Sequence, residues 1–435
     1  MKQRNFSLSC AVTFVLTAGL APTAMAAQAV SATEFLASLG VNTHLNYTDG
    51  SYADYDSVIA DLQYLGVHQV RDAVPDPRGG IPYQNDVTAI DAMAASGNRF
   101  DFIVNPALPV GITTDEIATL ERAHPGSVFA IEGPNETNNS PVTYQGLAGK
   151  AAAVAFQRAL YRQVHATPIL RGKSVYYYTG LDATNSLTGL ADFANAHPYS
   201  YQGQQPAARI ASAFAKQYLM APTYPKVITE AGYFNVPMAN DGVDDATQAK
   251  NNLNLYMDAF AQGNARTFIY QLVSAYPNGG SDTQSGLFRM DHSPKPAADA
   301  IHNLTTILAD AGKAGFKPAA LDYSVANLPV TAHSMLLQKS SGQFDIILWS
   351  EPADWNNITH EAIVNPPVSA TVTISGATGN MAVYDPMLGN QPIKHVLHTG
   401  QIAVNLVDHP VIIEVQPTRP DVLTAENLPP AGAAN

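Results

Sequence analysis

Residues 226–233 read Lys-Val-Ile-Thr-Glu-Ala-Gly-Tyr, and residues 128–136 read Val-Phe-Ala-Ile-Glu-Gly-Pro-Asn-Glu. Each stretch begins with a short apolar run rich in strand-forming residues, which is typical of a buried β-strand. In both stretches a glutamate stands at the end of the run or just beyond it, at Glu230 and Glu136. Runs of this kind that alternate with helical stretches predict a parallel sheet.

The same alternation continues from about Phe35 to Ile307. Its eight apolar runs are Gly40–Leu45, His68–Arg71, Phe100–Asn105, Ser127–Glu132, Ile169–Tyr176, Phe193–Pro198, Lys226–Glu230 and Arg266–Leu272. The helices predicted between and after them are Tyr55–Leu65, Val87–Ser96, Thr114–Ala123, Tyr144–His165, Ala207–Tyr218, Thr247–Gln262 and Lys295–Ala311. Eight strands alternating with helices over roughly 270 residues predict an α/β fold, one (β/α)8 TIM barrel.

After about Gly315 the helical pattern stops and alternating strands separated by turn residues take over. The strands predicted here are Ser334–Gln338, Phe344–Trp349, Ala370–Ile374, Met381–Tyr384, Ile402–Leu406 and Val411–Val415. Several short strands with turn signals between them indicate an all-β sandwich. We therefore expect a barrel domain over residues 27–315, a C-terminal β-sandwich over 316–416 and a loose tail over 417–435.

The N-terminus has the pattern of a secretory signal peptide. Lys2 and Arg4 precede an apolar run from Cys10 to Leu20, and Ala24-Met25-Ala26 supplies small residues at cleavage-site spacing. We expect residues 1–26 to be removed and the bacterial protein to be secreted or periplasmic. No later stretch reaches the roughly 20 apolar residues that a membrane span requires. Removal would also take away the only cysteine, so no disulfide is expected.

The net negative charge of the chain limits the classes of binding partner that we expect. Loss of Lys2 and Arg4 with the signal peptide takes the net charge from −13 to −15. Nucleic acids and anionic membranes attract basic surfaces, so neither is an expected partner. The expected substrate is neutral, or acidic and bound locally by a few arginines. The sequence suggests no cofactor and leaves the oligomeric state open.

In a (β/α)8 barrel the reactive groups lie at the C-terminal ends of the strands. Glu136 follows the fourth run and Glu230 ends the seventh, 94 residues later. Here the chain resembles the clan A glycoside hydrolases, nearest to family 39-like members with a C-terminal β-sandwich. Asn135-Glu136 resembles that clan's acid/base signature, and Thr229-Glu230 resembles its nucleophile.

Further strand ends extend the resemblance. Asn42 and His44 end the first run as a Gly-Val-Asn-x-His stretch does in relatives of family 39. Arg71 ends the second run, where the clan usually keeps an arginine that hydrogen-bonds the nucleophile. His197 and Tyr199 end the sixth run and match residues that flank the nucleophile in many members.

The chemistry explains why these residue types are needed. A retaining glycosidase places two carboxyls about 5 to 5.5 Å apart, one protonated and one ionised. We expect Arg71 to hold Glu230 ionised, Tyr199 to orient it, and the charge of Glu230 to help keep Glu136 protonated. Asn135 is expected to bind a sugar hydroxyl next to the scissile bond.

Aromatic platforms for sugar rings are expected among the tyrosines. Most barrels of the clan have a tryptophan after strand eight, but here the run continues Tyr270-Gln271 and both tryptophans lie in the expected sandwich. Tyr270 or Gln271 is expected to take that place, and Tyr233 is a further candidate platform.

We predict no metal site. The acidic stretch Asp241-Gly-Val-Asp244-Asp245 lacks the ligand spacing of a calcium loop. Asp244 or Asp245 is expected instead to cap the helix that begins near Thr247. A zinc site of His44, His197 and Glu230 is not favoured, because no His-Glu-x-x-His pair is present.

Together these patterns favour a retaining glycosidase, a hydrolase of carbohydrate metabolism that acts on a poly- or oligosaccharide. The alternative from another class is a non-catalytic carbohydrate-binding protein on a degenerate barrel. A structural protein of the cell envelope is a third hypothesis.

Overall fold

The computed structural model describes residues 25–74, 87–180, 186–217, 224–236, 242–277, 280, 284–375 and 379–417. Almost all of the predicted signal peptide (1–26) and of the predicted tail (417–435) lies outside the described residues. Among the described helices, none combines the length and the apolar character that crossing a membrane requires.

The predicted barrel is confirmed as a sheet of eight parallel strands. Its strands are β3 (Leu39–Asn42), β4 (Gln69–Ala73), β5 (Arg99–Ile103), β6 (Val128–Glu132), β9 (Ser174–Tyr176), β10 (Ala194–Ala196), β11 (Lys226–Ala231) and β12 (Asn264–Ile269). They are hydrogen-bonded in the order β10-β11-β12-β3-β4-β5-β6-β9, and a parallel bridge between Tyr176 and Phe193 joins the two outer strands. Because every strand points the same way, their C-terminal ends meet at one mouth.

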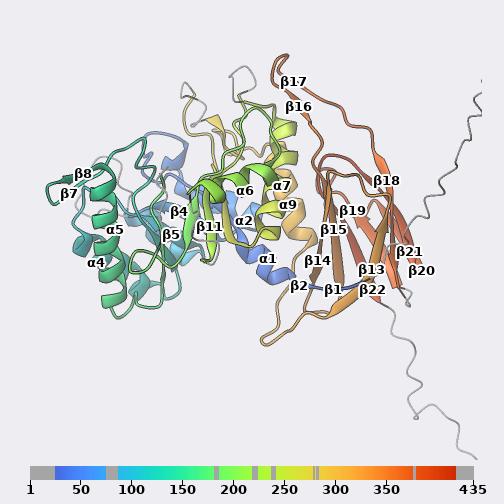
Figure 1. Cartoon of the computed structure of the whole chain (residues 1–435), viewed down its shortest axis with the longest axis horizontal. Coiled ribbons are helices and arrows are strands. Elements are labelled where there is room, and N and C mark those ends of the chain that lie inside the picture. The colour runs from blue at the N-terminus through green and yellow to red at the C-terminus, as the bar shows by residue number, and fades with distance from the viewer. Residues whose placement is uncertain are drawn as a thin grey trace, which may run out of the picture.

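Helices surround the barrel in the left half of Figure 1. They are α1 (Ala32–Ser38), the 3-10 helix η1 (Ser51–Ala53), α2 (Tyr55–Leu65), α3 (Val87–Ala95), α4 (Val110–Ala123), α5 (Gly149–Ala166), α6 (Pro206–Gln217), α7 (Asp245–Ala261) and α9 (Pro296–Ile307). A short hairpin of β7 (Thr143–Tyr144) and β8 (Leu147–Ala148) precedes α5.

Local chemistry fixes the ends of two of these helices. Asp54 Oδ1 accepts a hydrogen bond of 3.2 Å from the backbone nitrogen of Ser57 at the start of α2. Gly66 ends α2 in the left-handed region, with a φ of 65°. At the start of α7, Asp244 Oδ1 accepts a hydrogen bond of 2.7 Å from the nitrogen of Thr247. The predicted capping role of Asp244 is therefore confirmed.

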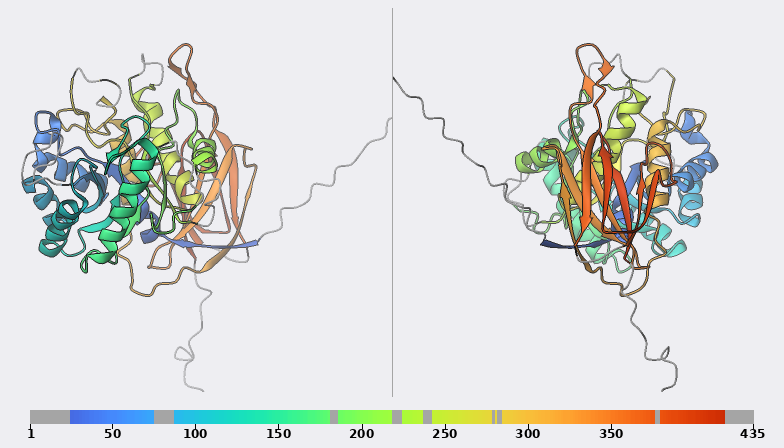
Figure 2. Two further views of the ribbon diagram at one scale, coloured as in Figure 1. Left: turned by 60° about the vertical axis from the view of Figure 1, so that its left-hand side comes forward. Right: turned by 90° about the vertical axis from the view of Figure 1, so that its right-hand side faces the viewer.

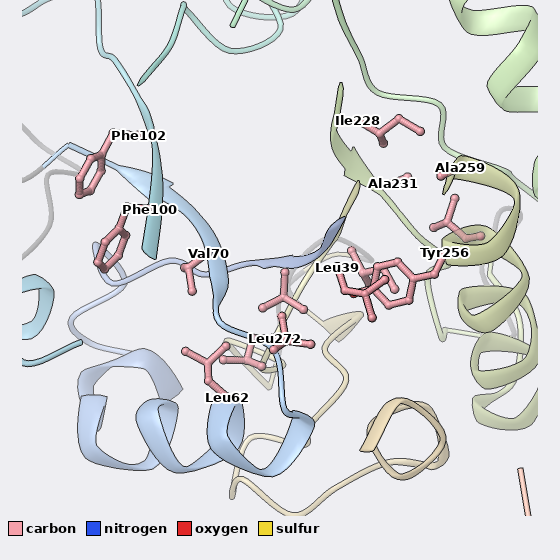
Figure 3. Packing of buried hydrophobic residues seen from close by; sticks show 14 of the residues in the cluster. Leu39, Leu62, Val70, Phe100, Phe102, Ile228, Ala231, Tyr256, Ala259 and Leu272 are labelled. Carbon is pink, nitrogen blue, oxygen red and sulfur yellow. The ribbon is translucent and has the colours of Figure 1, made fainter. Parts of the chain in front are cut away.

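The main core lies between the barrel strands and the helices that cover them. Figure 3 shows Leu39 and Val70 of the strands in one cluster with Leu62 of α2 and Tyr256 of α7. The Tyr256 hydroxyl donates a hydrogen bond of 2.7 Å to the carbonyl of Gly40, so this buried ring also satisfies its polar atom. Burial of each aliphatic side chain of this kind contributes about 1.5 to 3 kcal/mol to folding.

The predicted sandwich is confirmed as two antiparallel sheets of the C-terminal part, in the right half of Figure 1. Its strands are β13 (Ala320–Ala326), β14 (Ala332–Gln338), β15 (Phe344–Ser350), β18 (Val368–Ile374), β19 (Gly379–Tyr384), β20 (Lys394–Thr399), β21 (Gln401–Leu406) and β22 (Val411–Pro417). Of these, β13 and β20 were not predicted. Alternate residues such as Ile402, Val404 and Leu406 of β21 are buried between the sheets, while their neighbours are exposed.

The N-terminal segment adds two strands to this sandwich. β1 (Met25–Gln28) pairs with β13, and β2 (Val30–Ser31) pairs with β14. In Figure 2 the blue N-terminal strand accordingly lies against the orange and red strands. Residues 27–31 of the expected barrel domain thus pair with the expected sandwich domain. The expected cleavage point after Ala26 falls inside β1.

A hairpin of the sandwich domain reaches over to the barrel. It is formed by β16 (Trp355–Asn356) and β17 (Glu361–Ala362). Trp355 packs on Gly203, where an added Cβ would lie 2.3 Å from the tryptophan side chain. With a φ of 68°, Gly203 also has a backbone conformation that favours glycine. The hairpin therefore holds the loop between β10 and α6 close to the barrel mouth.

Candidate active site

Two glutamates meet at the barrel mouth. Glu230 is the fifth residue of β11 and its side chain is almost completely buried. Glu136 lies in the loop after β6 with a φ of 41°, and its backbone nitrogen donates a hydrogen bond of 2.8 Å to Thr179 Oγ1. One carboxylate oxygen of Glu136 and one of Glu230 lie within 4.8 Å of each other. The two side chains therefore come together at the mouth, as expected for residues at strand ends of one barrel.

Glu230 is bound by an arginine and a tyrosine. Arg71 Nη1 donates to Glu230 Oε1 over 2.5 Å, and the Tyr199 hydroxyl donates to Oε2 over 2.8 Å. His197 Nδ1 lies 3.6 Å from the same Oε2. Burial by itself would raise the pKa of Glu230, but the charges of His197 and Arg71 and the tyrosine hydrogen bond outweigh burial and lower it to about 2. Glu230 is therefore ionised at neutral pH.

Arg71 also binds a second buried carboxylate, which was not among the predicted site residues. Its Nε and Nη2 donate to the two oxygens of Glu132 over 2.7 and 2.9 Å. Its remaining hydrogen bonds go to Asn42 Oδ1 over 2.9 Å and to Asn135 Oδ1 over 2.8 Å. These contacts fix the guanidinium from several sides, so it cannot turn away from Glu230 without breaking them.

Glu136 has different partners. His197 Nδ1 lies 2.9 Å from Glu136 Oε1, and Asn139 Nδ2 donates to Oε2 over 2.8 Å. The hydrogen bond with His197 has the largest effect and lowers the pKa of Glu136, although burial and the charge of Glu230 oppose it. The charge of Glu230 thus acts on Glu136 in the expected direction, but the contact with His197 outweighs that repulsion in the free protein.

His197 connects the two carboxylates to the strand below them. Its Nε2 lies 3.0 Å from Thr229 Oγ1. Thr229 Oγ1 in turn lies within hydrogen-bond distance of Glu132 Oε1, at 3.1 Å, and of Asn195 Oδ1, at 2.9 Å. This network joins the ends of β6, β10 and β11, and it orients the imidazole toward Glu136.

The remaining predicted residues, His44, Tyr270 and Tyr233, have different surroundings. His44 lies beside the site in a cluster of aromatic rings, stacked on Tyr47 with centroids 4.6 Å apart and edge-on to Tyr270 at 5.2 Å. Burial lowers the pKa of His44 to about 4, so it is neutral at pH 7. Tyr233 is buried against Trp355, and its hydroxyl donates to the carbonyl of Gln204 over 2.7 Å. The structure thus gives Tyr233 a packing role in the hairpin contact.

A further acidic residue lies inside the barrel. Asp101 of β5 is completely buried, and neither of its oxygens receives a hydrogen bond from the residues that the structure describes. Burial and the adjacent charge of Glu132 raise the pKa of Asp101 well above its usual range. The sequence carried a signal for both residues, since a carboxylate within an apolar run needs a partner or a proton. Neither Asp101 nor Glu132 was among the predicted site residues.

Two cavities open at the mouth. One of about 330 Å³ is lined by Asn135 and by residues at the ends of β4, β5 and β6, including Ala73 and Ile103. A larger one of about 530 Å³ lies among the loops after β11 and β12, with Arg289 and Lys295 in its lining. Neither cavity is lined by Glu136 or Glu230, but the lining of the smaller one includes Asn135, the chain neighbour of Glu136.

Known proteins resemble this chain in structure but not in sequence. No protein family profile matches the chain, and no curated protein matches it. A family 39 glycoside hydrolase from Bacteroides cellulosilyticus superposes with a TM-score of 0.57 at 14% identity, over 88% of this chain and 82% of that one. A monomeric β-xylosidase from Caulobacter crescentus gives a TM-score of 0.55 at 15% identity, over 91% and 98%.

A third structure extends the likeness beyond bacteria. A 4-O-α-L-rhamnosyl-β-D-glucuronidase from Fusarium oxysporum gives a TM-score of 0.57 at 16% identity, over 91% of this chain and 98% of that one. At such identities the likeness concerns the fold alone. The chain has the fold of family 39-like glycoside hydrolases, a (β/α)8 barrel joined to a C-terminal β-sandwich.

Proposed function

We propose that this protein is a retaining glycoside hydrolase that cleaves O-glycosidic bonds of a poly- or oligosaccharide, with Glu230 as the nucleophile and Glu136 as the acid/base. The observation that carries the proposal is the separation of the two carboxylates, whose nearest oxygens lie within 4.8 Å. Retaining enzymes place these groups about 5 to 5.5 Å apart, and inverting enzymes need about 6.5 to 9.5 Å to admit a water molecule.

In the first step Glu230 attacks the anomeric carbon and forms a glycosyl ester while Glu136 protonates the departing oxygen. Arg71 and Tyr199 keep Glu230 ionised for this attack. Arg71 is held by Glu132 as well, so its position does not depend on the charge that Glu230 loses as the ester forms. A fixed cation of this kind needs no reorganisation during the reaction.

In the second step Glu136 takes a proton from the water that attacks the ester. Its hydrogen bonds with His197 and Asn139 favour the ionised form that this step requires. In the first step Glu136 must carry a proton, so turnover of substrates with poor leaving groups should fall as the pH rises through its pKa. Activated aryl glycosides need little protonation and should escape this fall.

The solved relatives suggest where a substrate search begins. Their names include a β-xylosidase and a β-glucuronidase, so we propose a β-linked sugar and begin with aryl β-xylosides and aryl β-glucuronides. A panel of plant and bacterial polysaccharides with reducing-end detection follows. Proton NMR of the first anomer formed then tests retention directly, and an inverted first product would refute the proposed mechanism.

Two variants assign the roles of the glutamates separately. Glu230→Ala should lose turnover, and azide should then yield a glycosyl azide of inverted configuration. Glu136→Ala should still react with an aryl glycoside, and azide should release a product of retained configuration. Glu34→Ala, which changes an exposed glutamate of α1, is the control and should keep full activity. Full activity of either site variant on an unactivated polysaccharide would exclude its proposed role.

The same panel separates the enzyme from the alternative of a non-catalytic carbohydrate-binding protein. Binding without turnover by the wild type, with an affinity that both alanine variants retain, would favour the binding protein. Export is also part of the proposal. N-terminal sequencing of the protein from a periplasmic extract should give a chain that begins at Ala27.

A further inference from the structure

A second cluster of ionisable side chains lies away from the mouth, where the barrel meets the sandwich. Asp258 comes from α7, Glu351 directly follows β15 and His333 belongs to β14. One oxygen or nitrogen atom from each side chain lies within 4.8 Å of the other two. His333 Nε2 and Glu351 Oε2 are 3.0 Å apart. The cluster therefore joins three elements of two domains.

The two carboxylates of this cluster are buried next to each other. Asp258 is 2% exposed, and only 8% of the Glu351 side chain is exposed. Trp349 Nε1 donates to Asp258 Oδ1 over 2.8 Å, but Oδ2 receives no hydrogen bond from any described residue. Among the described residues, His333 is the only group of basic character within salt-bridge distance of either carboxylate. Two adjacent buried carboxylates need a proton or a cation between them.

We propose that Asp258, Glu351 and His333 form a site for a divalent transition metal, with Zn²⁺ as the best match. Zinc binds imidazole nitrogen and carboxylate oxygen at about 2.0 to 2.2 Å, so neighbouring ligands lie roughly 3 to 3.5 Å apart. The His333–Glu351 separation of 3.0 Å fits this spacing. Calcium and magnesium prefer sets made of oxygen alone, which the imidazole does not match.

The surroundings support a metal in a structural role. The stacking of His333 on Trp349, with centroids 5.3 Å apart, and the hydrogen bond of Trp349 to Asp258 orient two of the three ligands. The His333 side chain is 42% exposed, so an ion can enter from solvent. An ion bound here would cross-link α7 of the barrel to two strands of the sandwich. The proposal departs from our expectation of no metal site.

The test uses full-length protein treated with EDTA and then dialysed against buffer without metal. Isothermal titration with Zn²⁺ should show one ion bound per chain at this cluster. At about a hundredfold excess over Kd, zinc should raise the Tm by roughly 2 to 4 °C. Glu136, His197 and Glu230 form the other described cluster of suitable atoms, so variants must identify which cluster is occupied.

Three substitutions remove one ligand each and keep the shape of the site. His333→Asn, Glu351→Gln and Asp258→Asn should each weaken zinc binding at least about tenfold and, at the same zinc concentration, remove about half of the Tm rise or more. Asp258→Asn retains the oxygen that accepts from Trp349. His124→Asn is the matched control, because His124 is paired with a single aspartate at 2.7 Å. The control should bind zinc like the wild type.

Two results would overturn the proposal. The first is zinc binding that is equal in the wild type and in His333→Asn, which would place the ion elsewhere. The second is a wild type whose Tm does not respond to zinc. If, in that case, Glu351→Gln and Asp258→Asn stabilise the protein, the two carboxyls share a proton and no metal. Both results are independent of glycosidase activity, so they do not bear on the proposed function.

Discussion

Replacement of Glu230 by glutamine should reduce stability at neutral pH and do so less in acid. Glutamine has the shape of a protonated glutamate but carries no charge, so it cannot form an ion pair with the guanidinium of Arg71. The folded protein lowers the pKa of Glu230 from 4.5 to about 2. A group whose pKa is lowered on folding stabilises the protein above its unfolded pKa, and this stabilisation disappears as the pH falls through the folded pKa. The relevant window therefore runs from about pH 4.5 down to about pH 2.

The size of the effect follows from that shift in pKa. A lowering by about 2.5 pH units corresponds to about 3 kcal/mol of unfolding free energy at pH 7. By pH 3.5 about 1 kcal/mol of this contribution should be lost, because most of the unfolded glutamate has already taken up its proton. We therefore expect Glu230→Gln to be less stable than the wild type by up to about 3 kcal/mol at pH 7, with a difference about 1 kcal/mol smaller at pH 3.5.

Urea unfolding of both proteins at the two pH values measures this difference, since the titrations of distant groups cancel between them. Glu361→Gln, which changes an exposed glutamate of β17, should match the wild type at both pH values. If Glu230→Gln equals or exceeds the wild type in stability at pH 7, the network does not favour the ionised nucleophile and our reasoning fails.

Three other changes have defined outcomes. His197→Asn removes the contact that lowers the pKa of Glu136. The basic limb of the pH profile of kcat/KM on an unactivated substrate should therefore move to higher pH. A basic limb that does not move would show that His197 does not lower the pKa of Glu136. Gly133→Ala would place a Cβ 1.8 Å from Gln157 Oε1, and thermal unfolding should show a loss of about 1 to 3 kcal/mol. Asp101→Asn should raise the unfolding free energy at pH 7, because burial and the charge of Glu132 disfavour the ionised form of this aspartate in the folded protein. That gain should vanish as the pH approaches about 4, and a constant gain would argue against protonation as its cause.

The order of the helices and strands could be predicted because it depends on local sequence patterns. Apolar runs of strand length alternate with helical stretches up to Ile307. After Gly315 they are replaced by strands in which every second residue is apolar. Each pattern indicates which face of a segment is buried. The short strand β2 could not be predicted, because two residues carry no periodicity. Its place in the sandwich depends on its pairing with β14, which is a contact between distant parts of the chain.

The site shows the same division. From the sequence we could place Glu136 and Glu230 at strand ends of one parallel barrel, because the direction of the strands brings all C-terminal ends to one mouth. The sharing of Arg71 with Glu132 and the lowering of the Glu136 pKa by His197 became visible only in the folded barrel. The physical reason is that pKa values and ion pairs depend on distances of a few ångströms between side chains, and closure of the barrel sets these distances.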